Sequence, residues 1–226
     1  MQSWSVARWT GALGLGGTVL QLLGFALFFA AGVPPGLSQQ DKLLSYVRDG
    51  RGVLTTAVLL FLLGFTLLLG FQAGFRSLVA TAAPHFEWLG TTALAAGVAT
   101  LVMGVVGIGI ALTAGVEAGS SSPQAASVRT LFEAGAVLAG APTLVPVAFY
   151  LGAVGSAGFM SRLLPLWLAL VGSAGSILVL IASLSAYGSN DVSAFWAANG
   201  LVTILALLPL YVWTLGASVM FLRKPA

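Results

Sequence analysis

The sequence predicts an all-α fold, a transmembrane bundle of six helices with a short amphipathic helix in the first loop. Three observations support this fold class. Of the 226 residues, 58% are hydrophobic and only 7% are charged, and a water-soluble domain of this length could not carry that balance without large exposed apolar patches. The hydrophobic residues are gathered into six long runs, and the central part of every run is free of charged residues.

Each apolar run is long enough to cross a bilayer, because a hydrocarbon core of about 30 Å needs roughly 20 apolar residues in a helix. The first run is longer than the core of a signal peptide, so we expect it to be a retained helix. We interpret residues 1–226 as one transmembrane domain with spans at approximately Trp9–Gly32, Val53–Phe75, Phe86–Gly115, Leu131–Ala153, Leu163–Ala186 and Phe195–Phe221. An even number of spans places both termini on one side of the membrane.

The first loop, "PPGLSQQDKLLSYVRDGRG", has helical character of its own. Ser38 and Asp41 have the spacing of a capping box, and Gly50 is suited to end a helix. Leu43, Leu44 and Val47 form one apolar stripe. The pattern predicts a short extracytoplasmic helix that lies either on the membrane surface or over the mouth of the bundle.

The third span contains a seam of small residues spaced alternately by three and four positions. Such a seam lets a neighbouring helix backbone approach closely, so this span is expected to be central in the bundle. The seam residues are Gly90, Ala93, Gly97, Thr100, Gly104, Gly107, Ala111 and Ala114.

The fourth span begins near a pair of opposite charges. Arg129 and Glu133 are four residues apart, which places them on one helix face where they can form an ion pair near the outer interface. Glu133 is the ionisable residue predicted to lie deepest. We expect a paired interfacial carboxylate, with a functional role for Glu133 as the alternative.

The same span carries Pro142 and Pro146 near its centre. Each proline removes a hydrogen bond to the carbonyl four residues earlier, so Leu138 and Pro142 are expected to have free carbonyls near mid-membrane. In lipid this would be costly, so the proline face should turn inward. Pro209 predicts a kink at similar depth in the sixth span, and two kinked helices favour an internal cavity. The polar residues expected to satisfy the inward face are Gln21, Thr143 and Tyr150.

The residues that catalysis or metal binding would need are scarce. The chain has no cysteine and a single histidine, His85, whereas a catalytic metal takes about three protein ligands. His85 and Glu87 stand where interfacial anchors of the third span are expected. We therefore expect no enzyme activity, no cofactor and no metal site, and the scattered basic residues predict no nucleic-acid partner.

Charges outside the spans bear on orientation. The side that holds both termini would carry Arg8, Arg76, Arg162, Arg223 and Lys224, and the other side Lys42, Arg48, Arg51 and Arg129. The bases alone barely distinguish the two sides, and the acidic residues are distributed less evenly. We expect cytoplasmic termini, with Glu87 on the terminal side and the other acidic residues opposite: Asp41, Asp49, Glu117, Glu133 and Asp191.

Several stretches resemble a group of uncharacterised six-helix multi-pass membrane proteins of high-GC bacteria, of the domain-of-unknown-function type. These stretches are "VARWTGALGLGGTVLQLLGFAL", "SQQDKLLSYVRDGRG", "SRLLPLWLALVG" and "LLPLYVWTLGASVMFLRK". The resemblance implies six helices and a location in the bacterial cytoplasmic (inner) membrane. It implies no activity and no functional residues.

These patterns lead to two main functional hypotheses, and a lipid-modifying enzyme is a third. The first is a non-enzymatic membrane protein that acts as a small binding or accessory subunit, with membrane lipids, other membrane subunits or copies of itself as partners. The alternative is a carrier or channel for a small apolar or zwitterionic solute, through a cavity lined by the fourth and sixth helices. The absence of charge at mid-span disfavours ion-coupled transport.

Overall fold

The computed structural model describes residues 5–32, 34–35, 39–188, 195–197 and 200–224. Its helices and 3₁₀ turns are α1 (Val6–Ala30), α2 (Gln40–Asp49), α3 (Arg51–Ala82), η1 (Pro84–Phe86), α4 (Glu87–Ala118), α5 (Ala125–Ala139), α6 (Ala141–Ser161), α7 (Leu166–Ser183), η2 (Leu184–Tyr187), α8 (Leu201–Leu205) and α9 (Leu208–Leu222). They form six helical units long and apolar enough to cross a membrane. The predicted fold class, a six-helix transmembrane bundle with a short helix in the first loop, is confirmed.

Four predicted span boundaries differ from the ends of the helical units by six residues or more. The fourth unit runs from Ala125 to Ser161, beyond both predicted ends at Leu131 and Ala153. The second span continues past Phe75 to Ala82, because Arg76 lies beside the following helix, where its guanidinium forms an ion pair with Glu87 and hydrogen-bonds to Thr91. Arg76 therefore lies within α3, paired with a residue of the following helix. The sixth span begins at Leu201 and not at Phe195, which lies in a turn before the helix.

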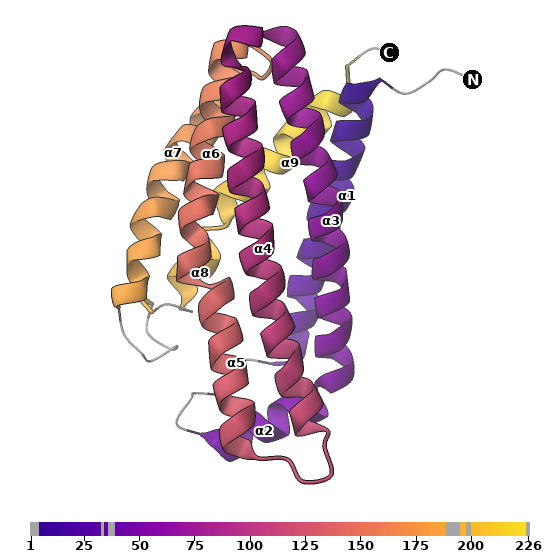
Figure 1. Ribbon diagram of the computed structural model, residues 1–226, viewed down its shortest axis with the longest axis vertical. Coiled ribbons are helices and arrows are strands. Elements are labelled where there is room, and N and C mark those ends of the chain that lie inside the picture. Colours follow the sequence, from indigo (N-terminus) through magenta and orange to yellow (C-terminus); the bar gives the residue numbers. More distant parts are fainter. Residues whose placement is uncertain (1–4, 33, 36–38, 189–194, 198–199, 225–226) are drawn as a thin grey trace, which may run out of the picture.

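Both described ends of the chain lie at the same end of the bundle, together with the turns that join α3 to α4 and α6 to α7 (Figure 1). We call this the terminal end. The opposite end, the loop end, carries α2 and the connection from α4 to α5 (Figure 1). This arrangement agrees with an even number of crossings.

Helix α2 covers the loop end of the bundle, the second of the two predicted placements. Leu43 and Val47 are fully buried against small residues of α4 and α5. Arg48 Nε donates to the carbonyl of Ala118 at 3.2 Å, and the Tyr46 hydroxyl donates to the carbonyl of Gly32 at 3.3 Å. Partial burial raises the pKa of Tyr46, which keeps its hydroxyl a donor. Ser38, the predicted cap, lies outside the described residues.

The small-residue seam of α4 faces the interior, as predicted. At its centre the backbones of α4 and α5 are in contact: a Cβ placed on Gly107 would lie 2.8 Å from the carbonyl oxygen of Gly135, and one on Gly135 would lie 2.7 Å from the backbone nitrogen of Ala111. Helix α4 also packs against α3 and α6. The buried members of the seam are Gly90, Ala93, Gly97, Gly104, Gly107 and Ala114.

The fourth and sixth spans are broken, where the sequence predicted kinks. Gly140 separates α5 from α6 with φ −89° and ψ −132°, and Pro142 lies in the first turn of α6, where its missing N–H costs no helical hydrogen bond. Pro146 follows inside α6. In the sixth span α8 ends at Leu205, and α9 begins at Leu208 with Pro209 in its first turn.

Candidate functional site

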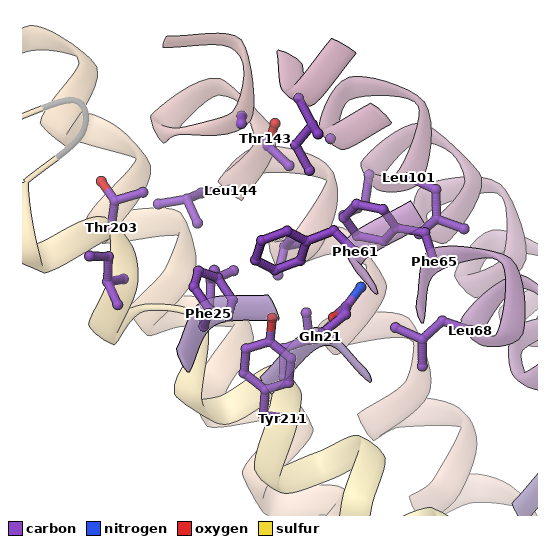
Figure 2. Close-up of a pocket in the computed structure, with 18 of the residues that line it drawn as sticks. Gln21, Phe25, Phe61, Phe65, Leu68, Leu101, Thr143, Leu144, Thr203 and Tyr211 are labelled. Atoms are coloured by element: carbon purple, nitrogen blue, oxygen red, sulfur yellow. The ribbon is translucent and has the colours of Figure 1, made fainter. Parts of the chain in front are cut away.

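A cavity of about 280 Å³ lies inside the bundle at the level of the two helix breaks. Residues of α1, α3, α4, α5, α6, α8 and α9 form its wall. Gly140, between α5 and α6, and Leu207, between α8 and α9, complete it. Figure 2 shows the part of this wall around Gln21 and Thr143. The volume is near the lower limit of typical small-molecule sites, which span about 300–1,000 Å³.

Both breaks contribute directly to the cavity. Ala139, Gly140 and Thr143 line it from the fourth span, and Ile204 and Leu207 from the sixth. Discontinuous helices in membrane proteins commonly border a ligand site, because the interrupted backbone is tolerated only where it is buried in protein or faces a cavity. The two breaks therefore identify this cavity as the candidate site.

Aromatic rings form much of the wall. Phe25 of α1 contacts Phe61 of α3 edge to face, with ring centroids 4.9 Å apart, and its centroid lies 6.2 Å from that of Tyr211 in α9. Figure 2 shows these three rings gathered around the side chain of Gln21. Phe65 and Tyr150 also line the cavity. Such a wall favours a ligand with a flat apolar ring.

Two glutamines bring polar groups into this apolar wall. Gln21 is 2% exposed and Gln72 is 7% exposed, and both line the cavity. Gln21 Nε2 and Gln72 Oε1 have no hydrogen-bond partner in the described structure. A buried polar atom without a partner costs about 1–3 kcal/mol, so Gln21 Nε2 and Gln72 Oε1 are available to a ligand or to water.

Glycines make room for these two side chains. A Cβ on Gly64 would lie 2.8 Å from Gln21 Cγ, and a Cβ on Gly97 would overlap the carboxamide of Gln72. Gly64 precedes Gln72 on α3 by about two helical turns, which is about 12 Å along the axis. The two amides therefore act at different levels of the cavity.

No residue in the described wall carries a formal charge at neutral pH. Its hydroxyl groups belong to Thr100, Thr143, Thr203, Thr214 and the two tyrosines. A wall of rings, amides and hydroxyls can hold an uncharged molecule by apolar contact and a few hydrogen bonds. It offers no ionised counter-charge for a charged one.

The cavity reaches the outer face of the bundle beside α1 and α8. Phe29 of α1 is 48% exposed and Ile204 of α8 is 37% exposed, yet both also line the cavity. Both residues belong to spans, so this outer face borders the lipid. The cavity wall therefore continues onto the lipid-facing surface at these two residues.

The predicted site residues separate into two groups. Gln21, Thr143 and Tyr150 line the cavity. The others are not part of its wall: Arg129 Nε donates to Glu133 Oε1 at 2.9 Å near the loop end, and the three prolines shape the helices behind the surface. The residues outside the wall are Arg129, Glu133, Pro142, Pro146 and Pro209.

A second cavity of about 120 Å³ lies nearer the loop end. It shares Phe28, Phe61 and Ile108 with the first cavity, and Arg51 and Val47 also line it. The shared side chains form the partition between the two spaces. The second cavity extends toward the side of the bundle that α2 covers.

The terminal end places the remaining reactive groups away from both cavities. His85 is exposed, and Glu87 forms an ion pair with Arg76. Among the described residues, no group of three or more histidines, cysteines, aspartates or glutamates could hold a metal ion. Reactive groups and cavity are thus separate.

The chain matches no family model, no curated protein and no solved structure.

Proposed function

We propose that this protein is a non-enzymatic multi-pass membrane protein that binds a small uncharged molecule in the cavity at the helix breaks. The single observation that carries the proposal is the junction of two discontinuous helices with an aromatic, uncharged cavity. The unpaired Gln21 Nε2 and Gln72 Oε1 in the same wall support it, because a buried polar atom without a partner lowers stability unless a ligand or water pairs with it. The protein would act as a binding or accessory subunit.

The proposal includes a location. We place the protein in the bacterial cytoplasmic membrane, following the sequence resemblance, with the terminal end in the cytoplasm. The bases Arg8, Arg76, Arg162, Arg223 and Lys224 belong to the terminal end and support this orientation. Lipids surround the bundle in this setting, and other membrane subunits or further copies of the chain are the candidate protein partners.

Two threonines of α4 allow a matched test of binding. Thr100 lines the cavity, and Thr92 is exposed on the same helix. Both hydroxyls donate to the carbonyl four residues earlier, at 3.0 Å for Thr100 and 2.9 Å for Thr92. Thr100→Phe should fill the cavity, whereas Thr92→Phe should only add a ring to the lipid-facing surface.

Native mass spectrometry of the gently extracted protein measures the outcome. The wild type and Thr92→Phe should retain a small non-covalent adduct, and Thr100→Phe should lose it while keeping its fold. Equal adducts in all three proteins, or none in the wild type, would contradict binding in this cavity.

A carrier for a small apolar solute is the second candidate function; the uncharged wall disfavours the zwitterionic solute that the sequence also allowed. The observation that favours it is the second cavity, which continues from the first toward the loop end behind Phe28, Phe61 and Ile108. A carrier needs such a route to one side of the membrane. In liposomes, Phe61→Ala should then increase the flux of a neutral aromatic probe above the wild-type rate, whereas a binding subunit should show no protein-dependent flux.

A further inference from the structure

We propose that the ligand is a neutral aromatic-ring molecule with a carbonyl or hydroxyl oxygen, which the carboxamide of Gln21 recognises. This chemistry is shared by the head groups of membrane quinones and by small neutral phenols. The inference rests on the proposed function, since it names the class of molecule that the same cavity takes. It is argued from the rings, the amides, the charge of the wall and its opening.

The rings around Gln21 supply the first argument. Phe25, Phe61 and Tyr211 come from three different helices, and Phe25 contacts the other two rings edge to face. Figure 2 shows these rings beside the side chain of Gln21. Aromatic pairs prefer offset or edge-to-face geometry and stabilise each other beyond simple burial. A flat ring can join this cluster, whereas a saturated chain would gain only apolar contact.

The two amides supply the second argument. Gln21 Nε2 is a buried donor without a partner, and a carbonyl or hydroxyl oxygen of a ligand can accept from it. Gln72 Oε1 is a buried acceptor without a partner, and it can accept from a hydroxyl or from a bound water. Gln72 lies about 12 Å along the axis of α3 from Gly64, the residue of that helix that contacts Gln21. The cavity thus offers a hydrogen-bond donor and an acceptor, on two different helices, within a mostly apolar wall.

The charge of the wall excludes other ligand classes. A carboxylate, a phosphate or an ammonium group would be buried without an ionised partner, which costs far more than a neutral oxygen does. The ligand is therefore neutral as well as aromatic.

The opening beside Phe29 and Ile204 bears on the source of the ligand. A head group held near Gln21 can leave an apolar tail in the lipid through this gap. A membrane quinone has such a tail, and a small phenol does not. A tailed probe therefore separates the two sources.

The test compares four probes by native mass spectrometry titration: naphthalene, 1-naphthol, 1,4-naphthoquinone and a quinone with a ten-carbon tail. The chain has no cysteine, so quinones cannot add to thiols. We expect naphthol and naphthoquinone to bind the wild type about tenfold more tightly than naphthalene, the effect of one hydrogen bond. Tight binding of the tailed quinone would indicate a membrane quinone, and its exclusion with tight naphthol binding would indicate a small phenol.

A variant at Gln21 shows whether the preference for oxygenated probes comes from its amide. Gln21→Met keeps the approximate shape of the side chain and removes the Nε2 donor, so the tenfold preference should disappear. Without ligand, this variant should unfold at the same temperature as the wild type or higher, because it removes an unpaired buried amide. If Gln21 served only to stabilise the fold, its replacement would lower the unfolding temperature. Gln124→Met, in the exposed loop before α5, is the control. It should change neither the preference for oxygenated probes nor the unfolding temperature.

Three outcomes would overturn the inference. Equal binding of naphthalene and the oxygenated probes to the wild type would leave binding in the cavity intact but contradict the proposed class of ligand. Retention of the preference in Gln21→Met would remove the role of the amide. Failure of every probe to bind would refute the proposed function itself. If Gln21→Met does not fold, the infrared carbonyl stretch of carbon-13-labelled naphthoquinone on the wild type decides: a shift to lower frequency supports the hydrogen bond, and an unshifted band contradicts it.

Discussion

The Thr143 hydroxyl donates a 2.6 Å hydrogen bond to the carbonyl oxygen of Leu138, across the break between α5 and α6. The break at Gly140 deprives this carbonyl of a helical partner in a part of the protein where water is scarce. Thr143 therefore satisfies the carbonyl and shapes the cavity wall at the same time. The bond makes an interrupted helix tolerable at this depth.

Thr143→Val should destabilise the protein by about 1–3 kcal/mol, because it leaves the Leu138 carbonyl buried without a partner. Thr143→Ser keeps the hydroxyl and should stay close to the wild type. Unfolding in mixed micelles with increasing sodium dodecyl sulfate measures both variants. Equal stability of the valine and serine variants would show that the bond is not needed at the break.

Gly107→Ala should separate α4 from α5, since the new methyl group would lie 2.7 Å from the backbone nitrogen of Ala139. The cost should be about 1–3 kcal/mol, as for other overpacked sites. Gly109→Ala is the matched control, because no atom lies within 4 Å of that position. It should stabilise α4 slightly, as alanine favours a helix more than glycine does. Effects of the same sign at both positions would contradict the close contact.

Glu133→Gln should leave ligand binding unchanged and alter stability by less than about 0.5 kcal/mol, the usual effect of a partly exposed pair of this spacing. The reason is that Glu133 pairs with Arg129 outside the cavity wall. Binding of naphthoquinone to this variant, measured by native mass spectrometry, checks the prediction. A large loss of affinity would connect the carboxylate to the site.

Single cysteines can report the orientation, because the natural chain has none. Ser121→Cys in the exposed loop between α4 and α5 should react with a membrane-impermeant maleimide in intact spheroplasts. Arg223→Cys, at the exposed terminal end, should react only after the membrane is permeabilised. The reverse pattern would place the termini outside the cytoplasm.

The sequence predicted the six spans and the central position of α4, because runs of apolar residues and regular small-residue seams are local signals. It also predicted disruption near Pro142, but not a full break at Gly140. A proline alone distorts a helix, whereas the combination of Gly140 with a following proline lets one helix end and another begin. The pairing of Arg129 with Glu133 followed from spacing alone.

Much of the cavity wall was missed. Gln72 lay close to the predicted end of its span at Phe75, where a polar residue needs no explanation, and only the extension of α3 to Ala82 places it well inside. The signal that could have found it is Gly97, a small residue that leaves space for a carboxamide. Phe25, Phe61 and Phe65 look like lipid-facing residues in sequence, because in a membrane protein hydrophobicity does not distinguish the outer face from an apolar interior.

An experimental structure of the protein in lipid nanodiscs would test the central claim most directly. We predict separate α5 and α6 helices at Gly140 and non-protein density beside Gln21, within the wall that Phe25, Phe61 and Tyr211 form. A continuous fourth helix, with Pro142 and Pro146 facing lipid and side chains filling the space beside Gln21, would contradict the account.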